Sequence, residues 1–223
     1  MIRAVVFDFD GVLANSEPLH FAAFRDVLAE KGVPFDAGEY YASYLGYSDL
    51  DLFHVLSRNR GLSWDRETVT ALVRRKAVRF EELEAQGAIF FPGAQAAVER
   101  LSASFPLAIA SGAIRPEIVR VLNRANLMRC FRAIVTAEDT PAGKPAPDPY
   151  VAAVKRLSDD LGEPLKEAEC VAIEDSRWGL DSARAAGLRT IAVTHTYQAS
   201  SLSDADVVID NLHDLTVERI AEM

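Results

Sequence analysis

Short apolar runs that alternate with helical patterns fill the second half of this 223-residue chain. Strands that are short and apolar throughout are buried on both faces, which is typical of parallel strands joined by helical crossovers. The runs with strand character are residues 107–110, 133–135, 170–173, 190–193 and 207–209. We therefore expect an α/β fold in which helices cover both faces of a parallel sheet.

The first strand is expected at the N-terminus, and it ends in two carboxylates. Residues 4–7 are apolar and are followed by Asp8, Phe9, Asp10 and Gly11. Side chains two residues apart lie on the same side of an extended backbone, so the two carboxylates lie close together. Such a pair repels by about 4 kcal/mol at an effective dielectric of about 20, which predicts a bound cation, a raised pKa or both. Taken alone, an acidic strand end is weak evidence, because Asp and Gly are common where strands stop.

A block of helical patterns without a strand separates this first strand from the others. The patterns begin at about residues 16, 36, 48 and 68. Ser16 is expected to cap the first of these helices through its hydroxyl. Lys76 lies on the apolar stripe of the last one, either as a side chain that extends past the edge of the stripe or as a cation directed into a cleft. The block ends at the Phe-Phe-Pro-Gly sequence of residues 90–93, which is typical of a linker, and we expect it to be an inserted helical domain.

Polar side chains follow the expected strands at their carboxyl ends, which meet at one edge of a parallel sheet. They are Asp8 and Asp10, Ser111 with Gly112, Lys144, and Glu174 with Asp175. Each alone has a simpler explanation as a turn, a surface charge or a helix cap. Together they suit phosphoryl transfer: carboxylates bind Mg²⁺, a lysine and a hydroxyl hold phosphoryl oxygens, one carboxylate attacks phosphorus and another moves a proton.

These motifs resemble the haloacid dehalogenase superfamily, in particular its branch similar to beta-phosphoglucomutase and phosphoglycolate phosphatase. The matching segments, in the family's order over nearly the whole chain, are Asp8-Phe9-Asp10-Gly11-Val12, Ala110-Ser111-Gly112, Lys144-Pro145-Ala146-Pro147-Asp148 and Ile173-Glu174-Asp175-Ser176. The resemblance implies a Rossmann-like, three-layer catalytic core of residues 1–16 and 92–223. It also implies a helical cap domain of residues 17–91.

The resemblance further implies how the acidic residues divide the chemistry. Asp8 would be the nucleophile that forms an aspartyl phosphate, and Asp10 the general acid and then the general base. Asp8, the backbone carbonyl of Asp10, Glu174 and Asp175 would hold Mg²⁺. The protein would then be a Mg²⁺-dependent phosphatase that acts on a small organic phosphomonoester.

Binding of the substrate falls to a different set of residues in this family. Ser111, Gly112 and Lys144 would hold the phosphoryl group. His20 and Lys76 match cap positions of the mutases and would contact the substrate. For His20 a purely structural place is equally compatible with the sequence.

Other branches of the family are distinguished by single positions. Asp10 argues against the dehalogenases, which lack the second aspartate, and against the phosphonate-cleaving members, which have a small residue there. The mutases carry an arginine after a Gly-x-Ser sequence of the cap, where this chain has Asp49 after Gly46-Tyr47-Ser48, and a serine where it has Ala113. A phosphosugar mutase is therefore the second choice, with Arg115 a partial substitute for the missing arginine.

A rival from another class is a phosphorylatable signalling switch of the receiver type. Such domains also gather acidic groups, a hydroxyl and a lysine at one edge of a parallel sheet. The helical insertion and the Asp-x-Asp sequence disfavour this alternative. Among the remaining candidates, His54, His195 and His213 show no ligand spacing and are assigned no role, and Trp178 is expected to pack.

Charge and composition limit the partners. A net charge of −9 argues against nucleic acid and anionic membranes but still allows a small anionic ligand in a local basic pocket. The resemblance implies that this ligand is a small phosphorylated metabolite. The two cysteines, Cys130 and Cys170, have no metal-type spacing and are expected to be reduced, in or near the core. With no apolar run of membrane-spanning length, the protein is expected in the cytoplasm, as a monomer or weak homodimer.

Overall fold

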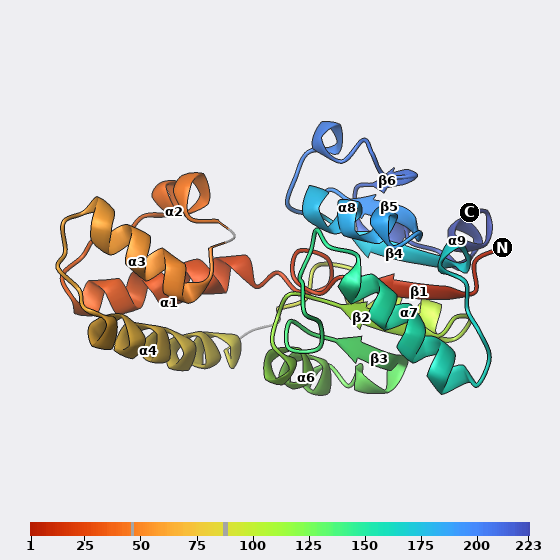
Figure 1. The fold of residues 1–223 in the computed structure, drawn as a ribbon, viewed down its shortest axis with the longest axis horizontal. Coiled ribbons are helices and arrows are strands. Elements are labelled where there is room, and N and C mark those ends of the chain that lie inside the picture. Colours follow the sequence, from red (N-terminus) through yellow and green to blue (C-terminus); the bar gives the residue numbers. More distant parts are fainter. Residues whose placement is uncertain (46, 87–88) are drawn as a thin grey trace. The chain divides into compact units, whose positions relative to one another are not determined.

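The computed structural model describes residues 1–45, 47–86 and 89–223. The chain forms two compact units, which we call the sheet unit, Met1–Asn15 with Ile89–Met223, and the helical unit, Ser16–Ala88. The helical unit is thus an insertion between the first strand of the sheet unit and the rest of it (Figure 1). No helix of the described ranges is both long and apolar enough to cross a membrane.

The sheet unit has an α/β architecture with six parallel strands, which confirms the expected fold class (Figure 1). The strand order is β3-β2-β1-β4-β5-β6. The strands are β1 (Ala4–Phe7), β2 (Leu107–Ala110), β3 (Phe131–Val135), β4 (Cys170–Glu174), β5 (Arg189–Val193) and β6 (Val207–Ile209). The order reverses at β1, which pairs with β2 on one side and with β4 on the other. The carboxyl end of β1 is therefore at the switch point of the sheet, where open α/β sheets bind ligands.

Helices pack against this sheet through small side chains. The α-helices of the sheet unit are α5 (Ala94–Ser102), α6 (Arg115–Arg124), α7 (Asp148–Leu161), α8 (Arg177–Ala185) and α9 (Val217–Ala221). Helix α7 contacts β1, β2 and β3, and α8 contacts β4 and β5. Alternate residues of the strands, many of them alanines, share one buried cluster with α7 and α8. Because alanine projects only a methyl group, the helices approach the sheet closely there.

The short 3₁₀ segments lie in the connections between these elements. They are η1 (Met128–Cys130), η2 (Glu167–Glu169), η3 (Ala199–Ser201) and η4 (Leu212–Asp214). Strand β3 begins at Phe131, two residues before the predicted strand of residues 133–135. Phe131 is buried, but the exposed Arg132 separates it from the apolar run. A single outward-facing charge in a strand thus concealed its start from the sequence pattern.

The helical unit is built around aromatic residues. Its described helices are α1 (Glu17–Glu30), α2 (Ala37–Ser43), α3 (Asp49–Asn59) and α4 (Arg66–Glu84), and α1 packs along α4. The side chains of Asp36, Ser48 and Asp65 cap α2, α3 and α4 by accepting a backbone N–H three residues on. The expected cap at Ser16 is wrong: its backbone is already helical, and within the described chain its side chain makes no capping bond to α1.

Candidate active site

The site begins with Asp8, the residue that follows central strand β1. The backbone N–H of Asp8 donates to the carbonyl of Ile173 at 2.9 Å, so β1 remains paired with β4 up to this residue. Its side chain is buried, whereas Asp10 is half-buried. The chain turns back directly after Asp10. The N–H groups of Leu13 and Ala14 both donate to the carbonyl of Phe9.

Lys144 joins the acidic groups of two adjacent strands. Its ammonium nitrogen lies 2.7 Å from Asp8 Oδ1 and 2.6 Å from Glu174 Oε1. The hydroxyl of Tyr150 donates to the same Glu174 oxygen at 2.7 Å, and the Tyr150 ring lies under the Lys144 ammonium. Glu174 Oε2 accepts from the backbone N–H of Asp175 and from Ser176. Both carboxylate oxygens of Glu174, which is completely buried, therefore accept hydrogen bonds.

Burial controls the titration of these groups. Loss of solvent raises the pKa of Asp8 well above its usual value, with Lys144 acting in the opposite direction and Glu174 in the same one. Burial and then Glu174 raise the pKa of Asp175 to about 7. For Lys144, burial alone would lower the pKa, but the Asp8 and Glu174 carboxylates raise it above its ordinary value. The Lys144 ammonium thus stays charged beside the acidic groups Asp8, Glu174 and Asp175.

The donor set at this edge fits a divalent cation. Asp8, Glu174 and Asp175 each present a carboxylate oxygen, and these oxygens all lie within 4.8 Å of one another. Hard cations such as Mg²⁺ prefer carboxylate oxygens. Burial first, and then repulsion from Glu174, raises the pKa values of Asp8 and Asp175, and a cation bound among these oxygens would offset that repulsion.

Ser111 and Gly112 follow the neighbouring strand β2. The backbone N–H of Ser111 donates to Val135 at 3.0 Å, which extends the pairing of β2 with β3, and its buried hydroxyl accepts from the N–H of Ala113. A side chain at Gly112 would meet open space. Arg115 is occupied, because its guanidinium donates to Asp139 at 2.6 Å and to a β3 carbonyl. This ion pair argues against Arg115 as a substitute for the missing mutase arginine.

His20 and Lys76 belong to the helical unit, where they contact each other. The ammonium of Lys76 lies 2.7 Å from Nδ1 of His20 and donates to Asp49 Oδ1 at 2.7 Å. It also lies over the rings of Phe24 and Phe80. Burial and then Lys76 lower the pKa of His20 to about 3, so its ring is neutral and accepts from the ammonium. The Gly46 position of the cap motif lies outside the described residues.

Three contacts of the site had no place in the sequence predictions. Tyr150 is bound to Glu174, and the side chain of Thr196 is bonded to Asp175. His195, to which the sequence assigned no role, lies 3.1 Å through Nδ1 from the carbonyl of Gly11. Its position two residues after the end of β5, at the same sheet edge, is the signal that could have found it. The packing expected of Trp178 is wrong, since the side chain is 64% exposed.

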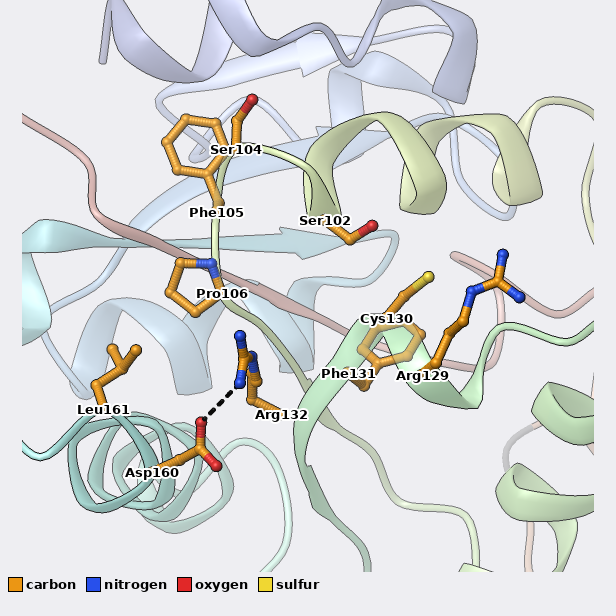
Figure 2. Close-up of a pocket in the computed structure, with 10 residues that line it drawn as sticks. All are labelled: Ser102, Ser104, Phe105, Pro106, Arg129, Cys130, Phe131, Arg132, Asp160 and Leu161. Atoms are coloured by element: carbon orange, nitrogen blue, oxygen red, sulfur yellow. Dashed lines mark ion pairs between the residues drawn. The ribbon is translucent and has the colours of Figure 1, made fainter.

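A hollow of about 570 Å³ lies at the opposite edge of the sheet, where β2 and β3 begin (Figure 2). It is lined by the segment around Pro106, by the start of β3 and by the end of α7. Arg132 faces Asp160 across it at 3.6 Å, and the side chain of Arg129 points away from that pair (Figure 2). Asp160 is the one carboxylate among the described residues that line this hollow, so it lacks the acidic cluster of the carboxyl edge.

Comparison with known proteins agrees with the motifs and the fold. A sequence profile of the haloacid dehalogenase-like hydrolases matches residues 2–187. Protein CbbY of Rhodobacter capsulatus is 32% identical over 100% of this chain and 99% of its own length. A phosphorylated carbohydrates phosphatase of Thermotoga maritima is 28% identical over 94% of this chain and 91% of its own. The crystal structure of CbbY from Rhodobacter sphaeroides in complex with phosphate superposes with a TM-score of 0.81 at 27% identity, covering 99% of this chain and 100% of that one. The chain therefore belongs to the haloacid dehalogenase-like hydrolases and is an enzyme of that family.

Proposed function

We propose that this enzyme is a Mg²⁺-dependent phosphatase that hydrolyses a small organic phosphomonoester through an aspartyl phosphate on Asp8. The observation that carries the proposal is the position of Asp8 at the switch point of the sheet, 2.7 Å from Lys144 and within 4.8 Å of the Glu174 and Asp175 oxygens. The phosphatase names of several relatives, and the phosphate bound by a CbbY protein, support the same reaction class.

In this proposal the two units have different tasks. The sheet unit is the catalytic core, expected from the sequence over residues 1–16 and 92–223, and the helical unit is the cap of residues 17–91. His20 and Lys76 match substrate-binding positions of the cap in related mutases, and we assign them to substrate binding on that resemblance. The substrate is a small phosphorylated metabolite.

The first half-reaction transfers the phosphoryl group to the protein. A carboxylate oxygen of Asp8 forms a bond to phosphorus while the bond from phosphorus to the ester oxygen breaks, and Asp10 donates its proton to that leaving oxygen. Lys144, the hydroxyl of Ser111 and the backbone N–H of Gly112 hold the phosphoryl oxygens. A Mg²⁺ ion bound by Asp8, the Asp10 carbonyl, Glu174 and Asp175 would supply positive charge against the developing negative charge.

The second half-reaction returns Asp8 to its starting form. Asp10, now a carboxylate, accepts a proton from water while the water oxygen bonds to phosphorus, and the bond from phosphorus to Asp8 breaks. Inorganic phosphate leaves and Asp10 is again protonated. One residue thus acts as acid and then as base, as the two half-reactions require.

Hydrolysis is favoured over phosphosugar isomerisation by the surroundings of Lys76. A mutase must hold a second phosphate, and a cation for it would have to come from the cap. Here Asp49 already accepts from the Lys76 ammonium, so the charge of this lysine is balanced within the helical unit. An acid beside a second phosphate would also repel it.

The decisive experiment measures turnover of p-nitrophenyl phosphate with and without Mg²⁺. We expect multiple turnovers that chelation with EDTA abolishes and that Asp8→Asn reduces by on the order of 10³-fold or more. Asp160→Asn, which changes an exposed aspartate at the opposite edge of the sheet, is the matched control and should retain wild-type activity.

Two other results would replace the proposal. Stoichiometric phosphorylation of the protein without turnover would indicate the signalling switch. With a beta-sugar phosphate as substrate, release of free phosphate supports hydrolysis, whereas an isomerised sugar phosphate would indicate the mutase.

A further inference from the structure

The segment after β5 is anchored to the sheet and reaches the turn that follows Asp10. The N–H of Thr194 donates to the carbonyl of Ile209 at 3.0 Å, so the segment leaves the sheet in a fixed direction. The next residue, His195, is half-buried, and its Nδ1 lies 3.1 Å from the Gly11 carbonyl oxygen. The imidazole also stacks on the ring of Phe91, with centroids 3.9 Å apart and an interplanar angle of 18°.

These contacts define the protonation of the imidazole. A backbone carbonyl only accepts hydrogen bonds, so Nδ1 of His195 carries the proton and donates it to Gly11. Burial lowers the pKa of His195 below its ordinary value, so the ring is neutral at neutral pH. The neutral imidazole therefore donates a hydrogen bond to the Gly11 carbonyl through Nδ1 and stacks its face on the ring of Phe91.

The turn that His195 contacts is also constrained by the Asp175 carboxylate. Gly11 has a φ of 79°, which favours glycine, and a Cβ at this position would overlap the Asp175 carboxylate. The N–H of Gly11 donates to the carbonyl of Ala14 at 2.9 Å, which closes the turn. Gly11 is thus in contact with Asp175 and with His195, and Asp10 is its immediate neighbour.

The same imidazole contacts both segments that connect the sheet unit to the helical insertion. Gly11 belongs to the outgoing segment and Phe91 to the returning one. The two segments pair with each other, since the N–H of Phe91 donates to Leu13 at 2.9 Å and the N–H of Asn15 donates to Ile89 at 2.6 Å. His195 therefore ties this pair of segments to the end of β5.

We propose that His195 is a positioning residue, which holds the Gly11 carbonyl and the Phe91 ring and so fixes the Asp10 carboxyl for proton transfer. The statement about Asp10 rests on the phosphatase proposed above, whereas the statement about the paired segments does not. An error in the position of the general acid matters most when the leaving group is a poor one. Alkoxide leaving groups need a proton, whereas p-nitrophenolate departs readily without one.

The experiment compares variants that separate the two contacts. His195→Phe keeps the stack and loses the donor, His195→Asn keeps a donor at the position of Nδ1 and loses the ring, and His195→Ala loses both. His54→Ala removes an exposed histidine of α3 and is the control. For each variant kcat/KM is measured with an alkyl phosphate and with p-nitrophenyl phosphate, and amide hydrogen exchange is followed at residues 11–15 and 91.

We expect His195→Phe to lower kcat/KM about tenfold for the alkyl phosphate and by no more than about twofold for the aryl phosphate. Because His195→Asn keeps the donor, it should retain most of the wild-type kcat/KM for both substrates. In His195→Ala the amides of Asn15 and Phe91 should exchange about three- to tenfold faster than in the wild type. Equal losses for both substrates, or unchanged exchange in His195→Ala, would overturn the positioning role. If the wild type turns over neither substrate, the phosphatase proposal fails, and the exchange measurement alone decides the role of His195 at the paired segments.

Discussion

Replacement of Gly179 by alanine tests whether helix propensity or the closeness of Glu174 decides the stability of the protein at this position. Gly179 lies in the first turn of α8, which begins shortly after Glu174, the last residue of β4. Helix propensity alone predicts that Gly179→Ala stabilises the protein by up to about 1 kcal/mol. The structure predicts the opposite sign, because a Cβ at Gly179 would overlap the carboxylate of Glu174.

The magnitude follows from what holds Glu174 in place. This side chain has no exposed surface, and its oxygens accept from Lys144 at 2.6 Å, from Tyr150 at 2.7 Å and from Ser176 at 3.2 Å. Moving the carboxylate away weakens hydrogen bonds to a buried charge, each worth about 1.5–3 kcal/mol. We take about 3 kcal/mol as the cost of the overlap. After subtraction of the helix propensity gain, Gly179→Ala should destabilise the protein by about 2 kcal/mol.

Urea unfolding followed by circular dichroism measures this change. Gly38→Ala is the matched control, because Gly38 is also helical and its Cβ would meet only Asp36 Oδ1, at 3.2 Å. Its free energy of unfolding should stay within about 1 kcal/mol of the wild type. In a Glu174→Ala background the overlap is gone, so Gly179→Ala should be neutral or stabilising there. The coupling between the two substitutions is then about 2–3 kcal/mol.

The reasoning is refuted if Gly179→Ala unfolds at or above the urea midpoint of the wild type. It is also refuted if the cost is the same with and without the Glu174 side chain. The second result would mean that the cost does not come from the carboxylate, and the first that the carboxylate moves aside without loss. The bonds from Lys144 and Tyr150 would then contribute little to the stability of this edge.

Two further predictions concern single polar contacts. Tyr150→Phe removes a buried donor to Glu174 and should lower the free energy of unfolding by about 1–3 kcal/mol, as read from urea midpoints. The Arg156 guanidinium holds the pKa of Asp139 well below its usual value, so this carboxylate stabilises the fold above its unfolded pKa of about 4, and the stabilisation is lost as the pH falls towards the lower folded pKa. Asp139→Asn should therefore be less stable than the wild type at pH 7, and the difference should shrink as the pH falls below 4; a difference that does not change with pH would contradict this assignment.

The sheet and its acidic edge were predictable because the information lies in single short runs. Residues 207–209, for example, were predicted as a strand with the bounds that the structure has for β6. Parallel strands bring their carboxyl ends to one edge of the sheet, so finding the strand that ends in Asp8 and the strand that ends in Glu174 was enough to expect both groups at that edge. The direct pairing of β1 with β4 was not predicted, because the sequence pattern does not specify the order of the strands.

The environment of Lys76 was beyond such reasoning. The sequence left open whether this lysine lies at the edge of the apolar stripe or points into a cleft, and its side chain is almost completely buried. It is bonded to Asp49, 27 residues away, and to His20, 56 residues away. Contacts of this kind depend on how helices cross, which side-chain periodicity does not specify. The prediction that Trp178 packs was wrong for a related reason. A residue in the first turn of a helix can face either the sheet or solvent.

His195 illustrates a deeper limit of sequence reasoning. Its ring partner, Phe91, is recognisable as an aromatic residue, but its hydrogen-bond partner is the backbone carbonyl of Gly11, a group that every residue possesses. Such a bond leaves no trace in the identity of the acceptor, and these two residues are 184 positions apart. The glycine is informative for another reason: its positive φ and its closeness to Asp175 exclude a side chain. The sequence of the turn therefore records the constraint from Asp175 but not the one from His195, although both act on the residue next to Asp10.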